Sequence, residues 1–383
     1  MNLRIILLFL IITANSVFAQ NEISNFKEKF DLPNQVKETS GLLFLNGKII
    51  THNDSGDSAN LYEIDSLNGS LLRTVSINNA SNIDWEDITE DENHIYIGDI
   101  GNNNGNRNDL TIYKVLKTDF KNNTSVTAEK ISFTYEDQTD FTNKPNSSNF
   151  DAETIVIFGE SILIFTKNWA NFETNVYEIP KLEGNYSAKK VSTANVEGLI
   201  TGGSYKSDRF YLTGYDATFT PFLIYIGFNR KPGSDIFFSG FSKISLENEM
   251  GKGSQIEGIT NIENTGKYYI SREFFTTNQN GMQFTFPQKL YEFFDFTFHL
   301  LSINKNNFNN LLLQPNPVKD KLTFTVSVEI TKIEIYNSLG KLISKTNKNL
   351  NNKVDVSGLS SGIYFLKLHS KNNKTTIKKF IKL

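Results

Sequence analysis

Residues 153–179 read ETIVIFGESILIFTKNWANFETNVYEI. An acidic residue opens the stretch, and short runs rich in Ile, Val, Phe and Tyr follow it, separated by Gly, Asn and charged residues. Runs of this length and composition predict β-strands. The stretch therefore predicts a meander of strands without a helix.

The same pattern occurs five times in the chain, each time opening with Glu and continuing to a Leu or Ile. The openings are Glu38-Thr39-Ser40-Gly41-Leu42, Glu86-Asp87-Ile88, Glu153-Thr154-Ile155, Glu197-Gly198-Leu199 and Glu257-Gly258-Ile259. A second strand is expected at 48–52, 94–98, 161–165, 209–213 and 267–271, and a third at 61–64, 110–113, 176–179, 222–225 and 290–293. Four copies add a fourth strand, such as 72–77. Strand quartets at this period predict the blades of a β-propeller.

The fifth copy stops after its third strand. Residues 26–32 supply the missing outer strand most economically, because this closure joins the first and last blades and hides an open edge. We therefore predict an all-β chain, with a five-bladed β-propeller followed by a small C-terminal β-sandwich. A sixth blade remains an alternative, within residues 133–149 or around Phe237.

The C-terminal part carries its own strand pattern, with alternation at 322–326, 333–336, 363–368 and 376–381. Two prolines, Pro315 and Pro317, stiffen its start. Gly340 and Gly362 are expected in tight turns. From residues alone, a generic adhesive sandwich module remains the alternative.

Four ordered blocks make this part distinctive: Gln314–Asp320, Ile335–Gly340, Leu359–Leu368 and Lys378–Leu383. Residues 313–383 resemble the C-terminal sorting domain of type IX secretion cargo. The resemblance implies an export tag of certain Gram-negative bacteria, which engages the type IX secretion machinery. It also implies that the protein is secreted or attached to the outer cell surface. The residues implied as the sorting signal are Pro315, Asn316, Pro317, Gly362, Tyr364 and Lys379.

The N-terminus predicts a secretory signal peptide over residues 1–19. Met1–Arg4 gives a basic start, an apolar run covers 5–12, and Ala19 ends a small-residue exit. Later segments fall short of the roughly twenty apolar residues of a membrane span, so we expect none. The expected organisation is therefore signal peptide 1–19, β-propeller 20–305, linker 306–312 and sorting domain 313–383.

Charge and cysteine content narrow the function classes. The chain has no Cys, which excludes disulfides, thiolate nucleophiles and zinc-thiolate sites. From Asn306 onward, thirteen Lys face two Asp and two Glu, a net charge of +9. Together with Arg4 and the whole-chain charge of −3, this leaves about −13 for the middle of the chain. An acidic middle argues against nucleic acid as its ligand.

The first strands of a propeller line its central channel, so the five repeated Glu predict an acidic ring. Asp84 and Asp151 each precede a repeated Glu by two positions, which puts each pair on one side of an extended chain. The loops after the second strands, 53–57 and 98–104, add short oxygen ligands. An all-oxygen set of this kind suits calcium. The metal-ligand candidates are Asp54, Asp84, Asp99 and Glu153, and the candidate bases are Glu86 and Asp151.

Each of these residues also has a structural interpretation. A repeated acid often accepts hydrogen bonds from a neighbouring blade, and Asp and Asn are common in turns. Trp85, Trp169, His52 and His94 are expected to pack between strands. Mutual repulsion within a carboxylate ring requires counter-charge, for which Lys37, Lys167 and Arg272 are the candidates.

The Glu-Gly-Ile/Leu repeats, the loop 53–56 and the segment 84–88 resemble the calcium-dependent propeller hydrolases, including phytase-like and gluconolactonase-like proteins. That resemblance implies a calcium cluster near the axis and hydrolysis of a phosphoester or lactone. The chain departs from a phytase in lacking a block of basic residues that would grip phosphate. The alternative is a non-catalytic surface propeller that binds a glycan or a protein. Across these interpretations, the ligand expected at the propeller face is a small molecule, a glycan or a protein.

Overall fold

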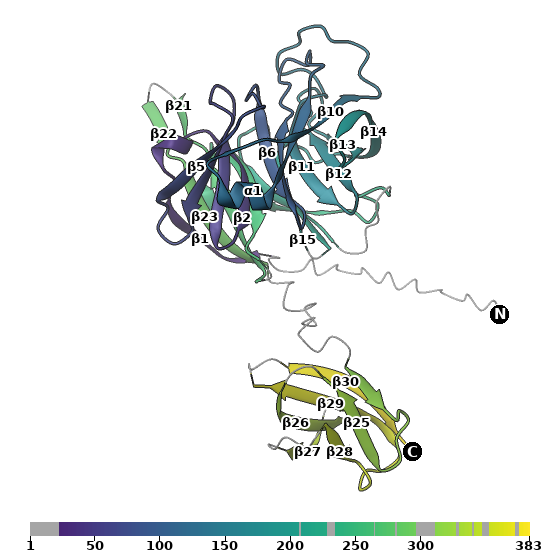
Figure 1. Ribbon diagram of the computed structural model, residues 1–383. Coiled ribbons are helices and arrows are strands. Elements are labelled where there is room, and N and C mark those ends of the chain that lie inside the picture. Colours follow the sequence, from purple (N-terminus) through teal and green to yellow (C-terminus); the bar gives the residue numbers. More distant parts are fainter. Residues whose placement is uncertain are drawn as a thin grey trace, which may run out of the picture. The chain divides into compact units, whose positions relative to one another are not determined.

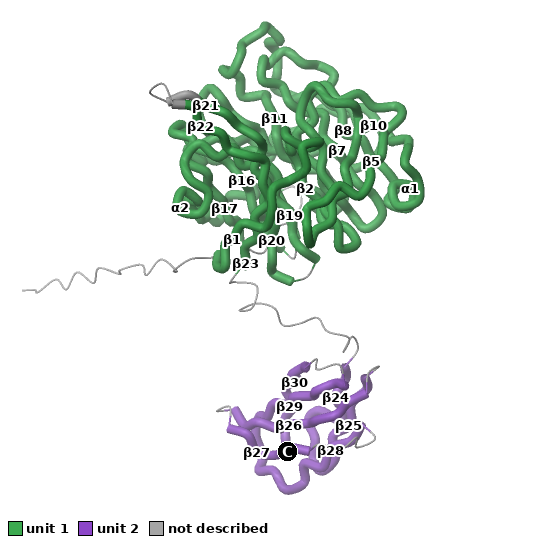
Figure 2. Tube along the Cα trace, turned by 90° about the vertical axis from the view of Figure 1, so that its left-hand side faces the viewer, with its two compact units in different colours: residues 1–297 green, residues 298–383 purple. Residues whose placement is uncertain are grey.

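The computed structural model describes residues 23–206, 208–227, 234–263, 265–279, 282–295, 311–326, 329–338, 341–346, 352–371 and 375–383. The chain divides into two compact units, Met1–Thr297 and Phe298–Leu383 (Figure 2). The expected signal peptide and the expected boundary at 305–306 lie outside the described residues. Among those residues, no helix is long and apolar enough to cross a membrane.

Unit 1 is built from antiparallel groups of four strands that follow one another along the chain (Figure 1). The first group is β2 (Thr39–Leu45), β3 (Lys48–Asn53), β4 (Asn60–Asp65) and β5 (Leu71–Ile77). The second is β6 (Trp85–Glu90), β7 (His94–Asp99), β8 (Thr111–Leu116) and β10 (Glu129–Tyr135). The third is β11 (Ala152–Phe158), β12 (Ser161–Thr166), β13 (Thr174–Pro180) and β14 (Gly184–Ala194). The fourth is β15 (Leu199–Lys206), β16 (Arg209–Tyr215), β17 (Pro221–Ile226) and β18 (Ser242–Ser245).

Short elements connect or extend these groups. They are η1 (Asn34–Val36), α1 (Lys117–Asn122), β9 (Ser125–Val126), α2 (Glu247–Met250) and the hairpin of β21 (Phe275–Gln279) and β22 (Met282–Phe286). Strand β9 extends the first group by parallel pairing with β5. Strands β10 and β14 also pair in parallel, which joins the second and third groups into one eight-stranded sheet.

The last group confirms the predicted closure by the N-terminal strand. It combines β19 (Ile256–Asn261), β20 (Lys267–Arg272) and β23 (Lys289–Asp295) with β1 (Ile23–Asp31) as its outer strand. Strand β1 pairs antiparallel with β23 along its whole length, from Ile23 opposite Asp295 to Asp31 opposite Lys289. The N-terminal strand therefore covers the edge that β23 would otherwise expose.

The first strands contact one another in a closed order, β2 to β6, β6 to β11, β11 to β15, β15 to β19 and β19 back to β2. Glycines make this approach possible. A Cβ on Gly41 would clash with the backbone of Asp87 and Ile88, one on Gly202 with the backbone of Glu257, and one on Gly258 with the backbone of Ser40. The result is a propeller-like arrangement around a central channel.

Apolar side chains fill the space between neighbouring groups. Trp85 of β6 is fully buried among Leu43, Ile50 and Leu61 of the first group, and the ring of His52 meets it edge-on with 5.6 Å between the centroids. Both residues therefore pack between strands, as expected.

The structure contradicts part of the predicted acidic ring. Every first strand carries a bulge or irregularity near its start, and Glu86, Glu153 and Glu257 lie within these irregularities. The positions that correspond to them in β2 and β15 are Ser40 and Thr201. Glu38 and Glu197 precede their strands and are exposed, so the ring holds three of the five predicted acids.

A sixth blade is absent from the described residues at both proposed places. Residues 136–150 form turns and irregular backbone, and residues 234–241 do the same around Phe237. Residues 129–135 are instead β10, the outer strand of the second group.

Unit 2 is a small sandwich of two antiparallel sheets. One sheet holds β24 (Leu312–Gln314), β25 (Lys321–Thr325) and β28 (Lys353–Asp355), in that order. The other holds β27 (Leu342–Thr346), β26 (Ile330–Asn337), β29 (Gly362–Ser370) and β30 (Thr375–Lys382), in that order. The core between the sheets includes Leu322, Ile335, Leu366 and Phe380.

The blocks of the predicted sorting signal meet in unit 2. The backbone amide of Ile381 donates to Asn316 Oδ1 at 2.9 Å, and the ring of Tyr364 stacks on Phe380 with 5.6 Å between the centroids. Lys379 is exposed on β30. Gly362 is the first residue of β29 and not part of a turn, while Gly340 lies outside the described residues.

Candidate functional site

Three carboxyl groups from two segments of the chain converge at one end of unit 1. Asp54 directly follows β3, Asp84 directly precedes β6, and Glu86 lies within β6. One ligand atom from each lies within 4.8 Å of the others, close enough to hold a metal ion. We call these three residues the acidic triad. They meet because second strands end and first strands begin at the same end of an antiparallel meander.

The backbone of the loop after β7 packs directly against the acidic triad. The amides of Ile100 and Gly101 both donate to the Asp84 carbonyl at 3.1 Å. A Cβ on Gly101 would clash with the carboxyl groups of Glu86 and Asp84. A side chain at position 101 would push these carboxyl groups aside, because the loop after β7 runs directly against them.

Burial and mutual repulsion disfavour the ionised forms of Asp54 and Glu86 in the acidic triad. Burial, together with the nearby carboxyl groups of Asp84 and Glu153, raises the pKa of Asp54 to about 8. Burial and neighbouring acids also raise the pKa of Glu86 well above its usual range. Among the described residues, no hydrogen-bond donor reaches Asp54 Oδ1. Such a group of carboxyls keeps protons or takes up a cation.

A buried ion pair stands beside the triad. Lys167 Nζ lies 2.7 Å from Glu153 Oε1, with both side chains almost fully buried. The ammonium also lies over the rings of Trp169 and Tyr215, at 5.1 and 5.6 Å from their centroids. Of the three candidates for counter-charge to the carboxyl groups, Lys167 is therefore the one that pairs with Glu153. Lys37 lies instead over the Phe274 ring, in an exposed position.

These groups line a cavity of about 230 Å³. Its walls include Asp54, Glu86, Glu153, Glu257 and Glu273, with Lys167 as the cation among the described lining residues. Burial first, then neighbouring acids, raises the pKa of Glu273 to about 8 and that of Glu257 well above its usual range. The cavity is therefore strongly acidic and contains carboxyl groups that ionise with difficulty.

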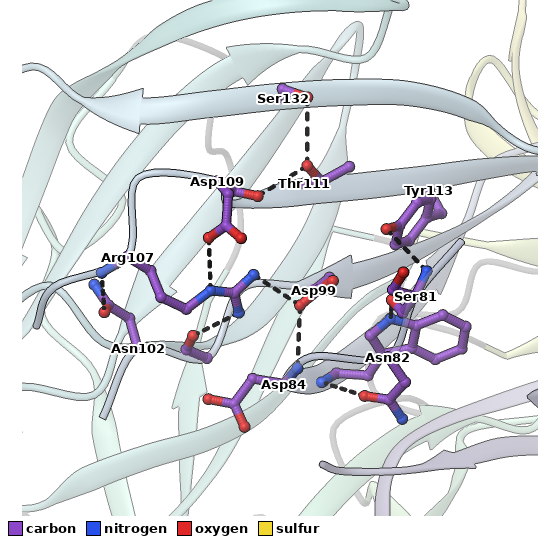
Figure 3. A network of polar contacts seen from close by, with 12 residues as sticks. Ser81, Asn82, Asp84, Asp99, Asn102, Arg107, Asp109, Thr111, Tyr113 and Ser132 are labelled. Carbon is purple, nitrogen blue, oxygen red and sulfur yellow. Dashed lines mark hydrogen bonds and ion pairs between the residues drawn. The ribbon is translucent and has the colours of Figure 1, made fainter. Parts of the chain in front are cut away.

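Asp99 belongs to a different network from the one predicted for it (Figure 3). Arg107 Nη2 lies 2.9 Å from Asp99 Oδ1, and the Asp84 amide donates to the same oxygen at 3.1 Å. Arg107 is held in turn by Asp109 and by the Gly101 carbonyl. Asp99 thus anchors the loop that carries Gly101, and it lies outside the group of carboxyls that could hold a metal.

Asp151 also has its oxygens occupied. It is fully buried, and it accepts a hydrogen bond from the Asn102 amide at 2.6 Å on Oδ1. Its Oδ2 accepts from the Trp169 indole at 2.8 Å. The indole hydrogen bond holds Trp169 at the cavity wall. The sequence predicts that Trp169 packs between strands, whereas the structure places it at the cavity instead.

The structural role foreseen for the repeated acids is taken by Asp87. Its carboxylate accepts from the Ile88 amide at 2.8 Å and from the Ile155 amide of the neighbouring group at 3.0 Å. Glu273 is a site residue that sequence reasoning missed. A signal was present, since Glu273 directly follows its second strand, as Asp54 and Lys167 do.

The comparisons with known proteins identify the C-terminal part of the chain. Residues 313–383 match the family model described as the secretion system C-terminal sorting domain. The protein is therefore a type IX secretion cargo with a β-propeller-like domain, and it is secreted or attached to the outer cell surface. No curated protein matches the chain.

Several solved structures are distantly similar to the chain. An exo-β-1,3-galactanase from Phanerochaete chrysosporium is 11% identical, with coverage of 93% of this chain and 100% of that chain and a TM-score of 0.42. A glucose dehydrogenase-type oxidoreductase from Thermus thermophilus is 7% identical, with coverage of 71% and 99% and a TM-score of 0.39. The hydrazine synthase of Kuenenia stuttgartiensis is 10% identical, with coverage of 90% and 78% and a TM-score of 0.33. Likeness at this level carries no conclusion about activity.

Proposed function

We propose that unit 1 is a five-bladed propeller which binds one calcium ion at the acidic triad and hydrolyses a neutral ester, such as a lactone, outside the cell. The convergence of Asp54, Asp84 and Glu86 within 4.8 Å carries this proposal. Five four-stranded groups and the closed order of their first strands support the blade number.

The donor set fits calcium. All three side chains offer carboxylate oxygens, which calcium prefers, and Asp54 Oδ1 has no donor among the described residues. A cation there would relieve the repulsion that raises the pKa values of Asp54 and Glu86. When bound, calcium would supply Lewis-acid polarisation of a substrate carbonyl.

Within this proposal, Glu86 is a ligand and Glu153 is the candidate base. Glu153 lines the cavity, and burial raises its pKa to about 7, with Lys167 opposing the shift. A general base works best when its pKa lies near the working pH. Asp151 is a poor base because both of its oxygens accept hydrogen bonds, so we assign it the positioning of Trp169.

The charge of the cavity favours a neutral substrate over a phosphoester. Five carboxyl groups and a single Lys are found among the described lining residues. A phosphoester anion would be repelled by these carboxylates even with one divalent cation present. A lactone or uncharged ester meets no such barrier.

The proposed activity is tested with purified protein, a panel of neutral lactones and an aryl phosphate, with calcium or with EDTA. We expect calcium-dependent lactone hydrolysis and a loss of at least about 100-fold in kcat for Glu153→Gln. Glu197→Gln is the control, because Glu197 is exposed and outside the cavity. Faster hydrolysis of the phosphate, or full activity of Glu153→Gln, would contradict the proposal. Binding without any turnover would favour the non-catalytic propeller instead.

Passage across the outer membrane should depend on unit 2. Unit 1 has its own cores and closes its own strand edge through β1, so deletion of residues 313–383 should leave it folded. We expect the truncated protein to accumulate in the periplasm, as measured by immunoblotting of cell fractions. Normal amounts of the truncated protein outside the cell would refute the sorting role.

A further inference from the structure

Two carboxyl groups that line the cavity, Glu257 and Glu273, are not among the proposed metal ligands. Glu257 lies in β19, and Glu273 directly follows β20. Both belong to the last strand group, whereas the acidic triad comes from the first two groups. Both nevertheless line the same cavity as Asp54 and Glu86.

Glu257 is buried without a partner for one of its oxygens. Its exposure is 5%, and no hydrogen-bond donor among the described residues reaches Oε2. A buried carboxyl oxygen without a donor is costly. This oxygen therefore marks a position where a ligand can donate.

The nearby cations already have close partners. Lys167 pairs with Glu153 at 2.7 Å. The Arg272 guanidinium donates to the Pro287 carbonyl at 3.1 and 3.0 Å. Burial, and after it the neighbouring carboxyl group of Glu273, raises the pKa of Glu257 well above its usual range. Lys167 opposes the pKa shifts of Glu257 and Glu273 as well as that of Glu153, so a single ammonium group serves three carboxyl groups.

Lys167 shows how this cavity holds an ammonium group. Its Nζ combines one carboxylate at 2.7 Å with two aromatic rings at 5.1 and 5.6 Å. An ammonium has three donors, and aromatic faces attract it. A ligand ammonium near Glu257 and Glu273 would meet the same kinds of groups.

Aromatic side chains lie at and beside the cavity. Trp169 and Tyr215 line it, and Phe219 stacks on Tyr215 with 5.6 Å between the centroids. Phe219 is 49% exposed. An apolar chain attached to the ammonium would find contact with these rings.

We propose that the cavity binds the primary ammonium group of an organic ligand with an apolar chain, through Glu257 and Glu273. This inference rests on the proposed function only in placing a cation on the acidic triad. The ammonium can belong to a free amine or to a lysine side chain. An alcohol of the same length would donate one hydrogen bond and bring no positive charge to these carboxyl groups.

The test is calorimetric titration of the mature protein, in saturating calcium, with n-butylammonium and with 1-butanol. We expect the amine to bind at least about ten-fold more tightly, which corresponds to about 1.4 kcal/mol. Glu257→Gln and Glu273→Gln should each weaken amine binding by about ten-fold, while Glu197→Gln should not change it. Nα-acetyl-lysine methylamide, with the norleucine analogue as its control, tests the lysine source. Melting curves show that each variant is folded, and Glu273→Gln serves if Glu257→Gln is not.

Equal binding of amine and alcohol, or no effect of either substitution, would overturn the inference. Calcium titration of the same proteins separates it from the proposed function. Calcium binding without amine binding would remove the ammonium site alone. Amine binding without calcium binding would remove the metal site alone.

Discussion

Replacement of Lys167 by Met should lower the free energy of unfolding by about 3–5 kcal/mol, the usual cost of breaking a buried ion pair. Lys167 Nζ lies 2.7 Å from Glu153 Oε1, and the side chains are 8% and 4% exposed. Without the ammonium, Glu153 would be buried beside Asp54 and Glu86 with no positive partner. Urea unfolding followed by circular dichroism measures this loss.

Two controls separate the ion pair from other effects. The double variant Glu153→Gln/Lys167→Met removes both charges and should recover much of the stability, because the unpaired charge causes most of the loss. Lys144→Met removes an exposed pair with Asp140, at 50% and 52% exposure, and should lower the stability far less, because solvent screens an exposed ion pair. A loss as small in Lys167→Met as in Lys144→Met would show that the buried pair is not required.

Without calcium, the stability of the protein should fall as the pH rises from about 4 to about 8. The pKa values of Asp54 and Glu273 are about 8, and that of Glu153 is about 7, whereas carboxyl groups of an unfolded chain titrate near pH 4. Between these values the folded protein binds more protons than the unfolded chain, so a rising pH favours unfolding. We expect a total loss of about 3 kcal/mol, because coupled groups share their shifts.

The measurement is thermal or urea unfolding at pH 5 and pH 8, in EDTA and in calcium. Calcium should remove most of the decline, since a bound cation favours the ionised carboxylates. Asp54→Asn should reduce the decline in EDTA, because the amide does not titrate. Stability that is constant or rises from pH 5 to pH 8 in EDTA would contradict the raised pKa values of these carboxyl groups.

The strand pattern could be predicted from the sequence because it depends on local composition. The runs 161–165 and 176–179 became β12 and β13, and the missing strand of the last group was found in the N-terminal segment. The register of the first strands could not be predicted. Glu38 and Glu86 occupy similar positions in the sequence repeat. In the structure, however, the residue of β2 that corresponds to Glu86 is Ser40, because of the bulge in β2.

The part of the site that depends on position along the strand meander could be predicted from the sequence. Asp54 and Asp84 flank strand ends and Glu86 is the second residue of β6; these positions share one end of unit 1, so the three side chains meet. The contacts of Asp99 and Asp151 depend instead on side chains that come from loops. Arg107 forms an ion pair with Asp99, and the Trp169 indole donates a hydrogen bond to Asp151. Repeat spacing carries no information about such contacts.

The calcium content of the mature protein, measured by calorimetric titration and by elemental analysis after dialysis, tests the metal site at the acidic triad most directly. A calcium-binding propeller should take up one calcium per chain. Asp54→Asn with Asp84→Asn should abolish this binding, and Glu197→Gln should retain it. No calcium binding by the wild-type protein, or the same stoichiometry and affinity in the double variant, would contradict a metal site at the acidic triad.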